Sequence, residues 1–299
     1  MSDEMDSSPA RFCRHRARPR KMPSVAAAEC TNYNGGPEQD SQAMPFFDSD
    51  GLKIHYIDEG RGAPVVLIHG FGLSAAEHWI STGVVGRLKS RWRVVAIDIR
   101  GHGQSAKPHD STKYGLANAR ADVLRLLDHL NVTRTRLMGY SMGSRIALEL
   151  LMLHPERLNA VVLGGFGQGG RIAVPGQRHR IAAALLAEDP RAIEDVLARR
   201  FRRGAERNGK DLRALAAYIA AEETTDSAAT IDFAALKRVT TPVLVVTVED
   251  DFIAGDPRPL KGWFRDARVI VIEGSDHASL AANQRFQQAV EEFFVSLAD

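Results

Sequence analysis

The chain has 299 residues, enough for one large α/β domain or two small ones. Its 44% hydrophobic and 25% charged residues are ordinary for a globular protein, and a net charge of +2 is too small to favour nucleic acid or an anionic membrane as a partner. No apolar run approaches the ~18 residues of a membrane span. The two cysteines, Cys13 and Cys30, give the rest of the chain no disulfide framework, which is typical of a reducing cytoplasm.

The first 45 residues differ in composition from those that follow. They are rich in polar residues, Gly and Pro and have no hydrophobic period, which predicts a disordered tail over residues 1–45. A basic cluster in this segment favours a targeting or nucleic-acid-binding arm as the alternative, but no apolar segment of a secretory signal follows it. Met44 directly precedes the first expected strand and is an alternative start of translation.

From Phe46 onward, strand and helix patterns alternate. Apolar or alternating runs predict strands at residues 52–56, 64–68, 94–97, 160–163, 243–246 and 269–272. Helical periods lie between them, at residues 115–130, 145–153 and 284–297. This order predicts a doubly wound, mostly parallel sheet, and such sheets carry their sites at the carboxyl ends of the strands.

One pentapeptide stands between a strand pattern and a helix pattern: Gly139-Tyr140-Ser141-Met142-Gly143. A serine on a sharp strand-to-helix turn needs small residues two positions before and after it, because the strained backbone leaves no room for a side chain there. The turn presents the hydroxyl to a base and puts the next amide at a helix N-terminus. The spacing therefore indicates a nucleophilic serine.

Polar groups follow the other strands. His69-Gly70 follows one, an Asp98-x-Arg100-Gly101-His102-Gly103-x-Ser105 segment follows another, and acids at 249–251 and His277 follow the last two. The chain order serine, acid, histidine, each after its own strand, is the triad order of one fold.

On these motifs, the sequence from Phe46 to the end resembles the α/β-hydrolase superfamily. The resemblance implies an eight-stranded sheet with a helical cap inserted after the sixth strand. It divides the chain into a core at residues 46–170 and 237–299 and a cap at residues 171–236. It also implies a catalytic triad and no cofactor or metal.

The resemblance assigns the triad to Ser141, Asp251 and His277. His277 is preferred as the base because it alone follows a strand. His154 is expected in the helix after the serine turn, and His179 in an irregular basic stretch. Asp251 matches the family position for the acid. Asp250 remains the alternative, because Val248 replaces the glycine that is usual in this turn.

The resemblance also implies an oxyanion hole built from the backbone amides of Phe71 and Met142. His69 is expected to orient its loop. Asp98, Arg100 and His102 are expected to form a structural salt-bridged turn rather than part of the catalytic machinery.

A second glycine pattern, Gly165-x-Gly167-x-x-Gly170, matches a dinucleotide fingerprint. Pro175 interrupts the helix that such a site requires, so we expect a flexible hinge instead. The Ala- and Arg-rich region beyond it predicts helices at residues 192–201 and 212–221 of the cap. Its basic run favours a solvated helix face over a device that steers acidic substrates.

We therefore expect a cytoplasmic serine hydrolase that cleaves a small ester or related acyl compound through an acyl-enzyme. Its expected partner is a small-molecule acyl substrate. The sequence leaves open whether the chain forms a homo-oligomer. One alternative is hydrolysis of carbon–carbon bonds in ring-cleavage products, although Tyr140 and Ala278 replace that group's usual Asn and Trp. Others are a cofactor-free haloperoxidase, disfavoured by Gly72, and a non-catalytic ligand-binding member of the fold.

Overall fold

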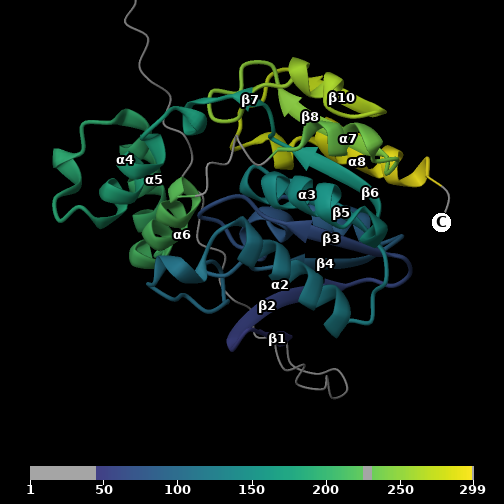
Figure 1. Cartoon of the computed structure of the whole chain (residues 1–299), viewed down its shortest axis with the longest axis horizontal. Helices are drawn as coiled ribbons and strands as arrows, with labels where there is room; N and C mark the ends of the chain where they lie inside the picture. The colour runs from purple at the N-terminus through teal and green to yellow at the C-terminus, as the bar shows by residue number, and fades with distance from the viewer. Residues whose placement is uncertain (1–44, 225–230, 298–299) are drawn as a thin grey trace, which may run out of the picture. The chain divides into compact units, whose positions relative to one another are not determined.

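A single large sheet organises the chain (Figure 1), of which the computed structural model describes residues 45–224 and 231–297. Its strands follow the order β1-β2-β4-β3-β5-β6-β8-β10. Their bounds are β1 Phe46–Ser49, β2 Leu52–Glu59, β3 Pro64–Ile68, β4 Arg93–Ile97, β5 Thr135–Tyr140, β6 Leu158–Gly164, β8 Val243–Val248 and β10 Ala267–Ile272. β2 pairs antiparallel with β1 and β4, and the other neighbours are parallel. The predicted doubly wound, mostly parallel eight-stranded sheet is therefore confirmed.

The expected disordered tail falls almost entirely on residues 1–44, which lie outside the described residues. Pro45, its last residue, is described, and its carbonyl accepts a hydrogen bond from the Tyr56 amide.

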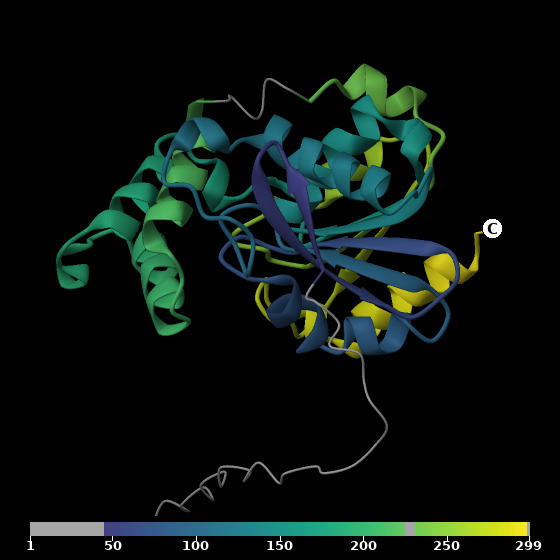
Figure 2. The same cartoon turned by 90° about the horizontal axis from the view of Figure 1, so that it is seen from below.

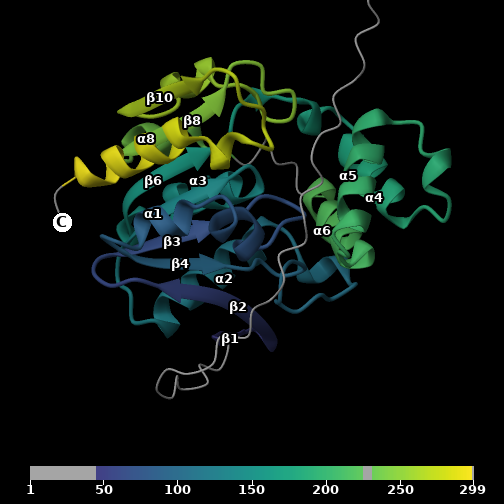
Figure 3. The same ribbon diagram turned by 180° about the vertical axis from the view of Figure 1, so that it is seen from behind.

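Helices cover both faces of the sheet. Figure 1 shows α2 (Leu116–His129), α3 (Met142–Leu153) and α7 (Phe233–Arg238) on one face, and Figure 3 shows α1 (Val84–Leu88) and α8 (Gln284–Val295) from the other side. Each face has its own buried core, one around the helices α2 and α3 and one around α1 and α8. The predicted helices at 115–130, 145–153 and 284–297 correspond to α2, α3 and α8.

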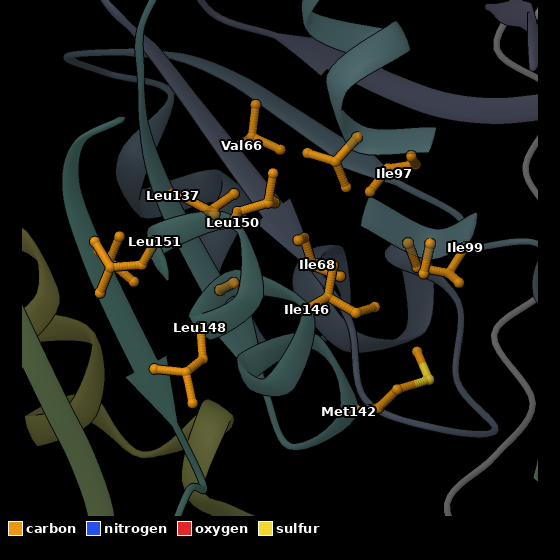
Figure 4. Packing of buried hydrophobic residues seen from close by; sticks show 14 of the residues in the cluster. Val66, Ile68, Ile97, Ile99, Leu137, Met142, Ile146, Leu148, Leu150 and Leu151 are labelled. Atoms are coloured by element: carbon orange, nitrogen blue, oxygen red, sulfur yellow. The ribbon is translucent and has the colours of Figure 1, made fainter. Parts of the chain in front are cut away.

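Successive residues of the central strands alternate between these two cores. Val66, Ile68 and Leu137 belong to the core that also contains Ile146 and Leu150 of α3 (Figure 4). Burying one such side chain contributes about 1.5–3 kcal/mol to folding. Because both faces are packed, the strands form a rigid base whose carboxyl ends hold their loops at fixed positions.

Three further helices lie between β6 and β8: α4 (Gln177–Leu186), α5 (Val196–Arg207) and α6 (Leu212–Thr224). They pack on one another through a separate apolar cluster that includes Ile181, Leu215 and Ile219, and they lie together to one side of the sheet (Figure 2). We call them the inserted helices. His179, expected in an irregular stretch, is instead part of α4.

The helix expected at 192–201 begins and ends later in the chain. The side chain of Asp195 accepts a hydrogen bond from the Ala198 amide at 2.7 Å, which caps α5 and sets its start. The basic run then continues the helix to Arg207. No helix within the described ranges is long and apolar enough to cross a bilayer.

The Gly165–Gly170 segment is not the flexible hinge that we expected. β7 (Gln168–Gly169) pairs antiparallel with β9 (Gly255–Asp256). A Cβ on Gly167 would lie 2.3 Å from the carbonyl oxygen of Gly255, and one on Gly170 would lie 2.0 Å from that of Ile253. These glycines are therefore required by a close approach of two backbones.

The remaining elements are single helical turns: η1 Ala76–Ile80, η2 Ser111–Lys113, η3 Pro155–Arg157, η4 Arg171–Ala173, η5 Pro190–Ala192, η6 Arg258–Gly262 and η7 Leu280–Ala282. Of these, η1 is a π-helical turn that follows the loop after β3 and contributes to the site described next.

Candidate active site

Ser141 occupies a strained turn between β5 and α3. Its φ of 52° and ψ of −109° lie in a region that few non-glycine residues adopt. A Cβ on Gly139 would lie 2.1 Å from the Gly143 carbonyl oxygen, and one on Gly143 would lie 2.1 Å from that of Ile68. The Ser141 amide donates to the Gly164 carbonyl at 2.8 Å, which ties the turn to β6. The two glycines of the pentapeptide thus make room for the turn that exposes the hydroxyl.

Three side chains from three loops form a hydrogen-bonded chain. Nε2 of His277 lies 3.0 Å from Oγ of Ser141. Nδ1 of the same ring lies 2.7 Å from Oδ2 of Asp251. The structure therefore brings the three residues proposed for the triad together, in an arrangement that lets the ring accept the serine proton on one side and donate to a carboxylate on the other.

The Asp251 carboxylate is held on its far side as well. Its Oδ1 accepts hydrogen bonds from the amides of Ile253 at 3.0 Å and Ala254 at 2.8 Å, and its side chain is buried. Asp250, the alternative acid, is exposed to solvent. Val248 is the last residue of β8 and is buried in the core. The turn after it brings Asp251 to His277 although the usual glycine is absent.

A cavity of about 350 Å³ opens next to Ser141 and His277. Its apolar walls include residues of the inserted helices and of the loops after β3, β6 and β8: Phe71, Phe166, Ile172, Phe201, Ile219 and Ile253. Phe71 and Met142 both line it, and neither of their amides donates a hydrogen bond to a residue in the described ranges. Both amides are therefore without an acceptor in the described ranges, as the predicted oxyanion hole requires.

His78 is a cavity residue that the sequence reasoning did not find. Nδ1 of its ring accepts a hydrogen bond from the Gly70 amide at 3.0 Å, and the ring packs edge-on against Tyr140 with centroids 4.6 Å apart. Burial, with the nearby imidazoles of His69 and His277, lowers the pKa of His78 to about 3. The ring is therefore neutral at pH 7, and its proton resides on Nε2. No motif indicated His78, because it is contributed by the short π-helical turn η1.

Tyr140 was also not assigned a role from the sequence. Its hydroxyl donates to the backbone carbonyl of His277 at 2.6 Å, and burial raises the pKa of this phenol. Its ring explains Gly165, where a Cβ would lie 2.8 Å from the ring and φ is +54°. Tyr140 thus links the serine turn to the histidine loop.

His69 and Asp98, at the ends of β3 and β4, make hydrogen bonds within the fold. His69 is buried and accepts a hydrogen bond from the Ile99 amide at 3.1 Å through Nε2, as expected for a residue that orients its loop. Asp98 bonds Nδ1 of His55 at 2.8 Å. Burial raises the pKa of Asp98, but hydrogen bonds from His55 and from backbone amides outweigh this and lower it to about 2.

Arg100 pairs with a different carboxylate from the one that its turn suggested. Its Nη2 lies 2.6 Å from Oδ1 of Asp122 on α2, and both side chains are almost fully buried. The expected salt-bridged turn is therefore a bridge between the end of β4 and a helix of the core. His102 is buried beside it, and burial lowers its pKa to about 3.

Comparison with known proteins agrees with this fold. Residues 63–168 match the family profile described as the alpha/beta hydrolase fold. A hydrolase from Pseudomonas aeruginosa has a similar solved structure, with a TM-score of 0.69 and 27% sequence identity, over 85% of this chain and 99% of that one. The chain belongs to the α/β-hydrolase superfamily.

Curated relatives match over shorter stretches. The chain is 35% identical over 147 residues to the dihydrolipoyllysine-residue acetyltransferase component of the acetoin cleaving system of Cupriavidus necator, which covers 48% of this chain and 38% of that protein. It is 32% identical over 121 residues to the 2-hydroxy-6-oxo-6-(2'-aminophenyl)hexa-2,4-dienoic acid hydrolase of Metapseudomonas resinovorans, 40% of this chain and 41% of that one. The chain thus spans about two fifths of the length of these relatives, which act on different compounds.

Proposed function

We propose that this protein is a cofactor-free serine hydrolase that cleaves a small ester or related acyl compound. The observation that carries the proposal is the hydrogen-bonded chain from Ser141 Oγ through His277 to Asp251, with distances of 3.0 and 2.7 Å. A serine hydroxyl becomes a useful nucleophile when a base takes its proton as it attacks.

The proposed reaction has two halves. Ser141 Oγ attacks the substrate carbonyl while His277 takes the hydroxyl proton, and Asp251 stabilises the imidazolium that forms. The amides of Phe71 and Met142 donate to the oxyanion, and His277 then protonates the leaving group. Water then attacks the acyl-enzyme while His277 takes its proton, and His277 returns a proton to Ser141 Oγ as the bond to the acyl group breaks and the acid leaves.

The cavity supports a small substrate. Its volume of about 350 Å³ is at the lower end of the range for ligand pockets, and most of its lining is apolar. Phe71, beside the proposed oxyanion hole, contacts Phe201 of α5 and Tyr218 of α6, with ring centroids 5.8 Å apart in both pairs. These contacts support a cap role for the inserted helices, which would keep water from the acyl-enzyme.

Carbon–carbon bond hydrolysis remains the second candidate, favoured by the likeness to the dienoic acid hydrolase over 40% of the chain. The same serine and histidine would serve both reactions. A cytoplasmic location, as expected from the sequence, belongs to this proposal too.

The test is turnover of p-nitrophenyl esters of graded chain length and of a vinylogous diketone by the wild type, Ser141→Ala and Ser111→Ala. We expect ester hydrolysis that Ser141→Ala lowers by at least about 10³-fold, and that the control Ser111→Ala, at an exposed position outside the cavity lining, leaves intact. Turnover of the diketone but of no ester would favour the second candidate. Full ester turnover by a folded Ser141→Ala protein would contradict both.

A further inference from the structure

Arg145 lines the cavity from α3, the helix that begins directly after Ser141. It stands four residues after Ser141, and its amide donates to the Ser141 carbonyl at 3.2 Å. Arg145 lies in the first turn of α3, and it lines the same cavity as Ser141. The guanidinium therefore borders the space that a substrate bound to Ser141 would occupy.

The guanidinium of Arg145 has no partner among the described residues. Its Nε is buried without a hydrogen bond, and no ion pair involves it in residues 45–224 or 231–297. Glu149, the carboxylate one turn further along α3, is bound by Arg120 at 3.0 Å instead. A partly buried cation without a counter-charge is unfavourable, because it has lost water without gaining a carboxylate.

Other buried arginines of this protein are partnered. Arg100 forms an ion pair with Asp122, and Arg202 donates to three backbone carbonyls and pairs with Glu206. The Nε of Arg202 is also without a hydrogen bond, but both of its Nη atoms are paired, whereas no described residue pairs with the guanidinium of Arg145. An anion in the cavity would pair with it.

The described lining of the cavity carries the positive charge of Arg145 and contains no Asp or Glu. Arg178 also lines the cavity, but it already has an interaction of its own. The remaining walls are mostly apolar. Such a lining fits an acyl compound with an apolar body and an anionic group, and it disfavours a cationic one.

We propose that Arg145 binds a carboxylate on the substrate, so that the preferred substrates are acyl compounds with a free acid group close to the bond that is cleaved. The planar guanidinium suits bidentate binding of a carboxylate. This inference rests on the proposed function, since it names the substrate class of the same site.

The kinetic test uses p-nitrophenyl half-esters of succinic, glutaric and adipic acid, each matched with the methyl ester of its free acid group. We expect the wild type to favour the charged half-ester over its neutral match in kcat/KM by about 10- to 100-fold, the range for a hydrogen bond to a charged group. Arg145→Gln should reduce this ratio to near one. Arg145→Lys should keep part of it, because the charge remains and the bidentate geometry is lost.

Arg203→Gln is the matched control, because it removes the same charge from an exposed position on α5. It should leave the ratio at the wild-type value. An equal fall in the control would mean that long-range attraction, not binding by Arg145, sets the preference. A wild-type ratio near one would also overturn the proposal.

A binding measurement separates this proposal from the catalytic one. Glutarate should bind Ser141→Ala protein in calorimetric titration, and the double variant Ser141→Ala, Arg145→Gln should bind at least about 10-fold more weakly. This arm needs no turnover, so it stands if the serine chemistry is wrong. Equal binding by the two proteins would overturn the role of Arg145 while leaving the proposed nucleophile untouched.

Discussion

Asp251 is held by three hydrogen bonds that leave its carboxylate one orientation. His277 occupies Oδ2, and the amides of Ile253 and Ala254 occupy Oδ1. Asp250 is adjacent in the chain but faces solvent, because neighbours in an extended loop point in different directions. The sequence left open which of the two carboxylates is the acid. The geometry favours Asp251.

Asp251→Asn should lower kcat by about 10³- to 10⁴-fold, since an equivalent change in a serine protease costs about 10⁴. The amide no longer favours the required tautomer of His277 or its charged form. Asp250→Asn, the matched control, should keep kcat within about 2-fold of the wild type, a variation of about 0.4 kcal/mol in the barrier. Steady-state kinetics at saturating ester measures both. A larger loss for Asp250→Asn would require the two residues to exchange roles.

At the scale of elements, the pairing of β7 with β9 connects the segment after β6 to the loop that carries Asp251. The Gly255 amide also donates to the Asp251 carbonyl at 2.7 Å, so β9 begins within the same turn as the proposed acid. The position of the carboxylate thus depends on two backbones remaining close. This dependence gives Gly167 and Gly170 a role in the site although neither carries a reactive group.

Gly170→Ala should lower both kcat and thermal stability, because its methyl group would lie 2.0 Å from the Ile253 carbonyl oxygen and force the strands apart. We expect at least about a 10-fold loss of kcat, since small displacements of catalytic groups have large effects. Gly204→Ala on α5 is the matched control: nothing lies within 4 Å of the added atom, and alanine is the better helix former. Wild-type kcat in Gly170→Ala would show that the pairing does not position the acid.

The sequence predicted the elements whose residues repeat with a regular period. The continuous apolar strands were found because burial on both faces demands them, and the serine turn was found because its glycines are sterically necessary. The short pair β7–β9 was not, since two-residue strands contain no period and their glycines resemble a different motif. His78 and the carboxylate partner of Arg100 were missed for a related reason: contacts between distant segments leave no local pattern.

At the scale of the whole molecule, buried neutral histidines couple stability to pH. His78 and His102 contact the loop after β3, at Gly70 and Phe71 respectively, and burial lowers the pKa of each to about 3. The unfolded chain binds protons at these residues near its ordinary pKa of about 6.5, so below that pH it is the unfolded state that gains them. Their contribution to stability is therefore complete above about pH 6.5 and decreases as the pH falls toward 3.

The free energy of unfolding should consequently fall between pH 7 and pH 5, by about 2 kcal/mol for each of the two histidines. Asp98 does not interfere, because with a folded pKa of about 2 it loses its contribution only below about pH 4. Urea unfolding at the two pH values measures the change. His102→Gln should reduce this fall by about 2 kcal/mol. Buried His69, whose pKa burial also lowers, still contributes in the variant. A wild-type free energy that is the same at pH 5 and pH 7 would contradict the prediction.

The proposed mechanism depends on Ser141, which acts as the nucleophile and forms a covalent intermediate. The most direct measurement is intact-protein mass spectrometry after treatment with a fluorophosphonate probe, followed by peptide mapping. We predict one adduct per chain, on the peptide that contains Ser141, with none on a folded Ser141→Ala protein and slower labelling of Asp251→Asn. An active wild-type protein without an adduct, or one labelled at another residue, would contradict the account.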